Sequence, residues 1–158
     1  MEIRRESLVR VTSEADLSER ESNLIEQARI AADNAYAPYS EFHVGTALKL
    51  SDGEIVLGNN QENAAYPSGL CAERTAIFYA HSKFPKQQIL RMAITAGSKN
   101  KKETTPIPPC GGCRQALVEY EQLQNKSIEL YFMGTDGRIA HSCSVENILP
   151  WIFDKSAL

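Results

Sequence analysis

The stretch VGTALKLSDGEIVLGN, residues 44–59, decides the fold that this sequence predicts. Two apolar runs flank the polar turn Ser51-Asp52-Gly53. An Asp-Gly pair between such runs is typical of a β-hairpin. We therefore expect residues 44–50 and 54–59 to be antiparallel strands and the first members of a sheet.

The segments around this hairpin alternate between helical and extended patterns. Before it, Ser18-Glu19-Arg20-Glu21 has the form of a capping box and predicts a helix over residues 19–36, which ends before Pro38. After it we expect, in chain order, a helix in CAERTAIFYAHS (71–82), a strand at 90–96, a helix from 111, and strands at 128–134 and 138–145. This order predicts an α/β fold, a three-layer α/β/α sandwich whose mixed sheet has about five strands.

Length and composition indicate one domain. A chain of 158 residues with 42% apolar residues buries one core, so we expect a single domain over residues 1–158. Residues 1–17 have three open interpretations: an added strand, an oligomer contact or a loose arm. The tail ENILPWIFDKSAL, residues 146–158, predicts a short helix or a docking arm.

The charge pattern disfavours a nucleic-acid partner. The net charge is -3 and the pI is about 5.7, whereas binding to a phosphate backbone needs clustered Lys and Arg. The one basic run, at residues 99–102, is expected at a loop tip. No apolar run predicts a signal peptide or a membrane span, so we expect a cytoplasmic protein whose four cysteines are thiols for metal or catalysis.

Three cysteines predict a metal centre. Cys110 and Cys113 form a C-x-x-C pair at the start of one expected helix, and Cys71 stands at the start of another. Helix starts favour thiolates, and three sulfur ligands leave the fourth tetrahedral position of a zinc ion to water. Glu73 follows Cys71 by two residues, and C-x-E with P-C-x-x-C is a signature of zinc nucleobase deaminases.

Longer motifs surround these cysteines and carry a resemblance to a family. The motifs are AYAPYSEFHVGTAL (35–48), GNNQENAAYPSGLCAERTA (58–76) and PCGGCRQAL (109–117). With them, residues 35–153 resemble the small cytidine deaminases that salvage pyrimidine nucleosides. Gln61 and Ala65 differ from the residues most often expected beside Asn60 and Tyr66.

The resemblance implies an activity and a metal. The activity is hydrolytic deamination of free cytidine and 2'-deoxycytidine to uridine and 2'-deoxyuridine by zinc-bound hydroxide. It implies one Zn2+ per subunit, held by Cys71, Cys110 and Cys113, with Glu73 as the proton shuttle. Three thiolates exceed the charge of the metal, and the resemblance implies that Arg74 offsets them by hydrogen-bonding the sulfurs.

The resemblance also implies how a nucleoside is held. Asn60 and Glu62 would bind the ribose hydroxyls, and Phe42 would pack near the nucleoside. Phe153 would reach the active site of a neighbouring subunit, because such short chains form homotetramers. Without the resemblance, the residues favour plainer interpretations: the segment around Asn60 is a polar loop, Trp151 and Phe153 are packing residues, and Arg74 is a surface ion-pair residue.

Two alternatives stay open at this stage. In one, Cys143 joins the other three cysteines in a closed, structural four-sulfur site, although its strand-like context favours a buried free thiol. In the other, the same chemistry acts on a base in single-stranded nucleic acid or on a nucleoside-like antibiotic. His43, His81 and His141 are dispersed and show no ligand spacing.

Overall fold

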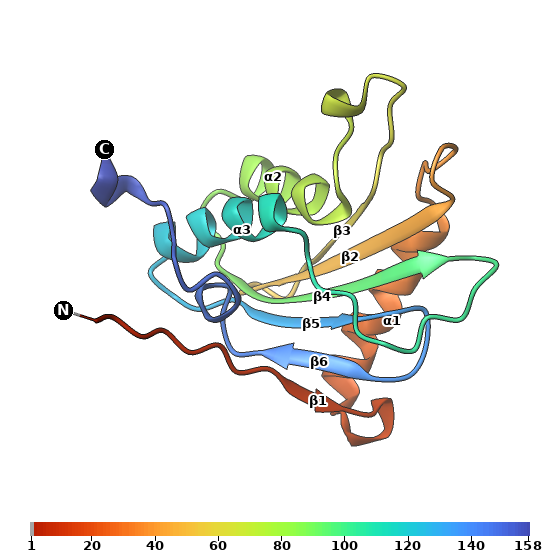
Figure 1. Cartoon of the computed structure of the whole chain (residues 1–158), viewed down its shortest axis with the longest axis horizontal. Helices are drawn as coiled ribbons and strands as arrows, with labels where there is room; N and C mark the ends of the chain where they lie inside the picture. Colours follow the sequence, from red (N-terminus) through yellow and green to blue (C-terminus); the bar gives the residue numbers. More distant parts are fainter. Residues whose placement is uncertain (1) are drawn as a thin grey trace.

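The structure is a computed structural model that describes residues 2–158 (Figure 1). Its helices are α1 (Glu19–Asp33), α2 (Ala72–Lys83) and α3 (Gly111–Leu123). Its strands are β1 (Arg10–Thr12), β2 (Phe42–Leu50), β3 (Ile55–Asn59), β4 (Ile89–Ser98), β5 (Glu129–Met133) and β6 (Ile139–Ser142). None of the helices in this described part of the chain is long and apolar enough to cross a membrane.

The strands form one mixed sheet in the order β1-β6-β5-β4-β2-β3. The β4–β5 pair is parallel and the other pairs are antiparallel, which confirms the mixed sheet and the hairpin of β2 and β3. The sheet has six strands and not five, because Arg10–Thr12 pairs with β6. A strand of three residues has almost no pattern of its own, and only its pairing with β6 defines it.

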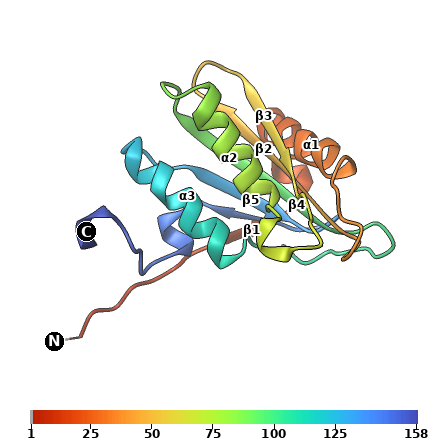
Figure 2. The ribbon, with the colours of Figure 1, turned by 90° about the horizontal axis from the view of Figure 1, so that it is seen from above.

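The helices cover both faces of the sheet, as the sequence predicts (Figure 2). α1 packs on one face through Leu24, Ile25 and Ala28, and α2 and α3 share the other face. Gly45 of β2 permits the close approach of α1, since a Cβ there would lie 2.0 Å from the Ala28 carbonyl oxygen. The fold is therefore a three-layer α/β/α sandwich.

The predicted boundaries shift at several ends. α1 begins at the capping box, where Ser18 N donates to Glu21 at 2.8 Å, but it ends at Asp33. β6 covers only residues 139–142, so Cys143 lies beyond the strand and is exposed, and the prediction of a buried thiol is wrong. The tail forms two 3-10 turns, at Glu146–Ile148 and Lys155–Ala157.

Candidate metal centre and active-site pocket

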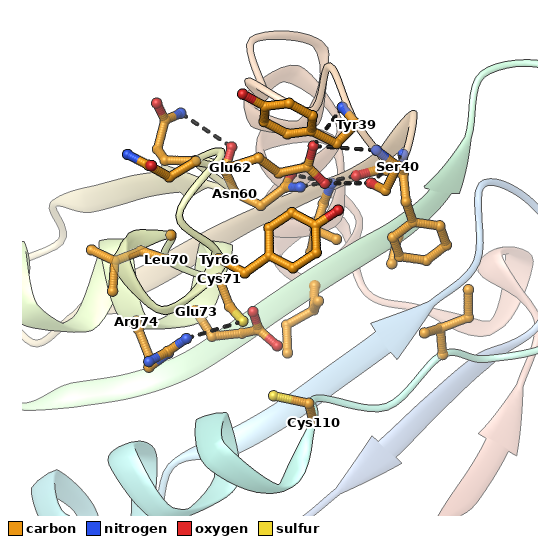
Figure 3. Close-up of a pocket in the computed structure, with 18 of the residues that line it drawn as sticks. Tyr39, Ser40, Asn60, Glu62, Tyr66, Leu70, Cys71, Glu73, Arg74 and Cys110 are labelled. Atoms are coloured by element: carbon orange, nitrogen blue, oxygen red, sulfur yellow. Dashed lines mark hydrogen bonds between the residues drawn. The ribbon is translucent and has the colours of Figure 1, made fainter.

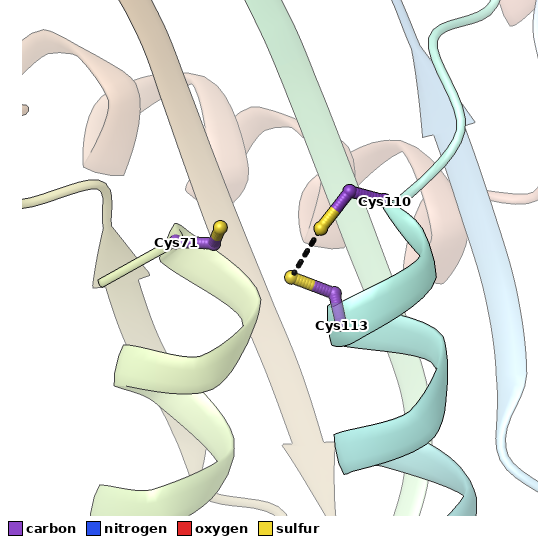
Figure 4. Close-up of side chains that lie close together, drawn as sticks. All are labelled: Cys71, Cys110 and Cys113. Atoms are coloured by element: carbon purple, nitrogen blue, oxygen red, sulfur yellow. Dashed lines mark hydrogen bonds between the residues drawn. The ribbon is translucent and has the colours of Figure 1, made fainter. Parts of the chain in front are cut away.

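The N-terminal ends of α2 and α3 bring three thiols together (Figure 4). Cys71 is the N-cap residue of α2, Cys110 is the N-cap residue of α3, and Cys113 lies one turn into α3. The three Sγ atoms lie within 4.8 Å of one another, and the Cys110 thiol donates to Cys113 Sγ at 3.4 Å. Sulfurs bound tetrahedrally to one zinc ion are about 3.8 Å apart. The separations therefore fit a shared zinc ion.

The start of α2 is fixed by a close contact with the sheet. Gly58 of β3 faces the first turn of this helix, where an added Cβ would lie 2.6 Å from the Ala72 carbonyl oxygen. Glycine at this position lets α2 pack directly on β3 and so determines where Cys71 stands. Arg74, in the same turn, donates from Nη2 to Cys71 Sγ at 3.5 Å.

The electrostatics of the thiol group favour a thiolate. A hydrogen bond from Cys113 lowers the pKa of Cys71 to about 5, and the Arg74 guanidinium acts in the same direction. Both N-cap cysteines also face unpaired N–H groups and the positive end of a helix dipole. Arg74 Nε is buried and has no hydrogen-bond partner among the described residues, which leaves a spare donor beside the sulfurs. This donor set suits a soft divalent cation such as zinc.

Glu73 lies next to the thiols in the first turn of α2. The residue is 4% exposed, and Figure 3 shows its side chain pointing into the pocket between Cys71 and Cys110. Burial raises the pKa of Glu73, because desolvation disfavours the charged carboxylate. A carboxyl group in such a place is suited to proton transfer.

The pocket above the thiols has a volume of about 680 Å³. Asn60 and Glu62 form part of its wall and hold neighbouring backbone (Figure 3). Asn60 Oδ1 accepts from Val44 N at 2.8 Å, and its Nδ2 donates to the Phe42 carbonyl oxygen at 2.9 Å. Glu62 accepts from the backbone N–H of Tyr39 at 2.9 Å.

A second pair of donors completes the environment of Glu62. The hydroxyl and the backbone N–H of Ser40 both donate to this carboxylate. These bonds, with the hydroxyl of Ser40 contributing most, lower the pKa of Glu62. The carboxylate therefore stays ionised in the pocket wall and fixes the loop before β2.

The structure places most of the predicted site residues around this one pocket. Those that line it are Phe42, Asn60, Glu62, Cys71, Glu73, Arg74 and Cys110. Cys113 does not line the pocket, but its Sγ lies within 4.8 Å of those of Cys71 and Cys110. Phe153 is absent from the described residues that line the pocket, and 62% of it is exposed. Among the described residues, the group of close ligand atoms contains three cysteines and not Cys143, which contradicts the four-sulfur alternative.

Sequence reasoning missed several lining residues. Tyr39 and Tyr66 stand at the pocket with their rings edge to face and 6.2 Å between centroids. Both lie inside the motifs quoted above, so the motifs contained a signal that was not used. Ile94 of β4 and Ile107 also line the pocket. Ile107 follows no pattern, because only the path of the loop before α3 brings it there.

A three-thiol centre beside a buried carboxyl defines the class of zinc-dependent hydrolases. The family model described as "Cytidine and deoxycytidylate deaminase zinc-binding region" matches residues 18–126. A cytidine deaminase of Halalkalibacterium halodurans is 39% identical over 82% of this chain and 91% of its own length. A cytidine deaminase of Sporosarcina psychrophila is 38% identical over 85% of this chain and 92% of its own length.

The fold gives the same result. A crystal structure of cytidine deaminase from Burkholderia pseudomallei aligns with a TM-score of 0.73 and 34% sequence identity, over 87% of this chain and 100% of that chain. The chain belongs to the cytidine deaminase family. The family resemblance in the sequence and the α/β/α fold are thereby confirmed.

Proposed function

We propose that the protein hydrolyses the exocyclic amino group of free cytidine and 2'-deoxycytidine, giving uridine and 2'-deoxyuridine with release of ammonia. The observation that carries this proposal is a buried Glu73 beside three thiols at the base of a nucleoside-sized pocket. Cys71, Cys110 and Cys113 would hold one zinc ion. When bound, zinc makes water acidic enough to act as a nucleophile near pH 7.

Glu73 would carry the protons of the reaction. Its carboxylate takes a proton from the attacking water and delivers it to ring nitrogen 3 of cytosine. It then takes the proton of the hydroxyl added to carbon 4 and gives it to the exocyclic amino group, which leaves as ammonia while the uracil carbonyl forms. One carboxyl group serves all three transfers because it stands beside the thiols and faces the pocket (Figure 3). Arg74 would offset the charge of the thiolates through its bond to Cys71.

Asn60 and Glu62 would bind the ribose with the hydrogen-bonding capacity that the backbone leaves free. An amide has two N–H groups and a carboxylate has about four acceptor sites. Asn60 uses one N–H on Phe42, and Glu62 uses three acceptor sites on Tyr39 and Ser40. Asn60 Oδ1 also has a second acceptor site beside the one that Val44 N uses. One N–H of Asn60 and two acceptor sites, one on each residue, therefore remain for sugar hydroxyls, and Phe42 would pack near the nucleoside.

The charges around the pocket favour a nucleoside over a nucleotide or a polynucleotide. Arg74 is the one cation among the described residues that line the pocket, and it is bonded to Cys71. The ionised Glu62 would repel a phosphate. A nucleic-acid strand needs a basic track, and the pocket offers none among these residues.

The proposal also covers the domain organisation, the location and the oligomeric state of the protein. Residues 1–158 would act as one catalytic domain in the cytoplasm, where thiols stay reduced. Four copies would associate, since large aromatic side chains are exposed: Tyr66 is 75% exposed and Trp151 is 63% exposed. Phe153 would then pack in the active site of a neighbouring copy. Light scattering of the purified protein tests the tetramer.

One assay tests the activity. The purified protein is incubated with cytidine, 2'-deoxycytidine, cytidine monophosphate or a short cytosine-containing oligonucleotide, and the loss of cytosine absorbance is followed while bound zinc is quantified. We expect turnover of the two nucleosides, little of the monophosphate and none of the oligonucleotide, with one zinc per chain. Turnover of the oligonucleotide alone would contradict the substrate assignment.

A further inference from the structure

The segment that leads into Cys110 has little regular structure to hold it. Residues 99–109, all of which the structure describes, form no helix or strand. Pro108 and Pro109 have no backbone N–H groups, so these two residues cannot hold this end of the loop by donating backbone hydrogen bonds. Cys110 is exposed, whereas Cys113 is buried within α3. The position of the Cys110 sulfur therefore depends on what holds Pro109.

Arg114 supplies that anchor. Its Nε donates to the carbonyl oxygen of Pro109 at 2.8 Å, immediately before Cys110. Its Nη1 donates to the carbonyl oxygen of Ile148 at 3.0 Å, at the end of the 3-10 turn that begins the C-terminal segment. The guanidinium is planar and its donors have fixed directions, so the two bonds together fix the distance between these carbonyls. One side chain thus ties the cysteine loop to a distant part of the chain.

The positive charge of Arg114 lies at an unfavourable position in α3. Arg114 is the fourth residue of α3, near the positive end of the helix dipole, where a positive charge destabilises a helix. The hydrogen bonds of Arg114 to Pro109 and Ile148 offset this unfavourable interaction with the dipole.

We propose that Arg114 is a positioning residue for the metal centre. It holds Pro109, and through Pro109 it sets the direction of the Cys110 sulfur. This differs from Arg74, whose guanidinium contacts Cys71 Sγ itself. The inference rests on the zinc site of the proposed function and adds a residue that touches neither metal ligand sulfur nor nucleoside.

Gln115 provides a matched control for the test. It is the next residue of α3, and its Nε2 donates to the carbonyl oxygen of Phe153 at 2.8 Å. Gln115 therefore also holds the C-terminal segment, but it has no bond to the loop that carries Cys110. Comparison of the two residues separates an effect on the cysteine loop from an effect on the tail.

The experiment measures release of zinc from the loaded protein to a chromogenic chelator. We expect Arg114→Ala to release zinc about 10-fold faster than wild type or more, as is typical when a ligand loses its supporting hydrogen bonds. Arg114→Lys, which retains the charge but can reach only one carbonyl, should be intermediate. Gln115→Ala should release zinc at the wild-type rate.

Two further readouts exclude a purely structural effect. The cobalt-substituted Arg114→Ala variant should show a shifted thiolate-to-cobalt absorption band, and its kcat for cytidine should fall while KM changes less than about two-fold. Where Arg114→Ala fails to fold, Arg114→Lys decides the question by the same measurements.

Wild-type release rates in both Arg114 variants would overturn the inference and leave the proposed function intact. Equal acceleration by Gln115→Ala would also overturn it, since the effect would then come from the tail. Failure of the wild-type protein to bind zinc would instead overturn the proposed function itself.

Discussion

Two regions of this molecule are built in opposite ways. The thiol end, which consists of the N-terminal ends of α2 and α3 with Cys71, Cys110 and Cys113, is made from two short local motifs. The β1–β6–β5 side of the sheet, with the C-terminal segment 143–158, is held by single side chains that bridge residues far apart in the sequence. Asn147 bonds Leu8 across 139 positions, and Glu121 bonds Glu146.

The thiol end therefore serves metal binding and catalysis, whereas the β1–β6–β5 side serves the stability of the fold. At the thiol end, Arg74 keeps a donor free beside the sulfurs, because its Nε has no partner among the described residues, although Arg114 uses its donors on Pro109 and Ile148. On the β1–β6–β5 side, polar side chains use their capacity on backbone groups. We therefore expect changes at the thiol end to remove metal or turnover at small cost in stability, and changes on the other side to do the reverse.

The largest expected effect is loss of a thiol ligand. Cys110→Ser should bind little zinc and retain below about 1% of wild-type turnover, because a hydroxyl is a poor ligand for zinc. Cys143→Ser is the matched control, since Cys143 is exposed and lies outside the thiol group. It should keep wild-type zinc content and turnover. Metal analysis and the cytidine assay measure both, and loss of zinc in Cys143→Ser would favour a four-sulfur site.

Glu73→Gln should separate metal binding from catalysis. Removing the proton carrier should lower kcat by about 100-fold to 10,000-fold, while zinc content and thermal stability stay near wild type. Glu119→Gln, an exposed carboxyl on α3, serves as the control and should be fully active. Unchanged turnover in Glu73→Gln would remove this residue from the proposed mechanism.

On the opposite side, Glu121→Ala should be the most destabilising change. Glu121 is 7% exposed, and its carboxylate accepts from the backbone N–H groups of Ile128, Val145 and Glu146 at 2.7 to 2.9 Å. Alanine would leave these groups without a partner, at a cost of about 3 kcal/mol or more in the free energy of unfolding. Urea denaturation measures this cost, with Glu119→Ala as the control.

Glu121→Ala should not affect nucleoside binding in the pocket. We expect folded Glu121→Ala protein to keep a KM for cytidine close to wild type, because the residue lies at the far end of α3 from the cysteines. A stability equal to that of Glu119→Ala would show that the three bonds contribute little, and the contrast between the two regions would weaken.

Asn147→Ala should have a smaller effect on the same side. Asn147 accepts from Leu8 N at 3.0 Å and donates to the Leu8 carbonyl oxygen at 2.7 Å, so it joins the N-terminal segment to the C-terminal turn. The loss should lower the free energy of unfolding by about 1 to 2 kcal/mol. Asn23→Ala, at an exposed position of α1, is the control. Thermal unfolding in parallel distinguishes them, and equal melting temperatures would contradict the prediction.

The smallest effect concerns acid stability. Hydrogen bonds from Ser18 and Tyr131 lower the pKa of Glu21 from 4.5 to about 2 in the folded protein. A lowered folded-state pKa means that the ionised carboxylate stabilises the fold above pH 4.5, and that this contribution is lost as the pH falls toward 2. Glu21→Gln should therefore lose less stability than wild type over this window.

Denaturation curves at several pH values check this expectation. Glu19→Gln, in the same helical turn, should follow the wild-type pH dependence. An identical slope for Glu21→Gln and wild type would show that the bonds to Glu21 from Ser18, at 2.7 Å, and from Tyr131 of β5, at 2.6 Å, are not maintained in solution.

Sequence reasoning succeeded where the signal is local. The capping box at Ser18, the Asp-Gly turn at Gly53 and the C-x-x-C pair each place an element through residues a few positions apart. The thiol group follows from such signals, since two helix starts carry all three sulfurs. These features depend on short-range geometry that a sequence pattern expresses directly.

It was incomplete where a contact spans the chain, since an added strand was only one of three open interpretations of residues 1–17. β1 exists because Arg10–Thr12 pairs with β6, about 130 positions later, and nothing within the strand predicts that partner. The position of Glu121 in α3 does not distinguish it from other helix residues in the sequence. Its buried carboxylate accepts hydrogen bonds from backbone N–H groups of Ile128 and Val145, which lie outside the helix. Arg114 was likewise visible only as part of a motif, because Ile148 is 34 positions away.

β1 has a consequence for how copies of this protein meet one another. A sheet that ended at β6 would present a row of unpaired backbone groups, and such edges recruit strands from other molecules and promote aggregation. β1 covers that row with three residues and is itself too short to template a long ladder. The N-terminal segment thus prevents strands of other molecules from pairing with β6.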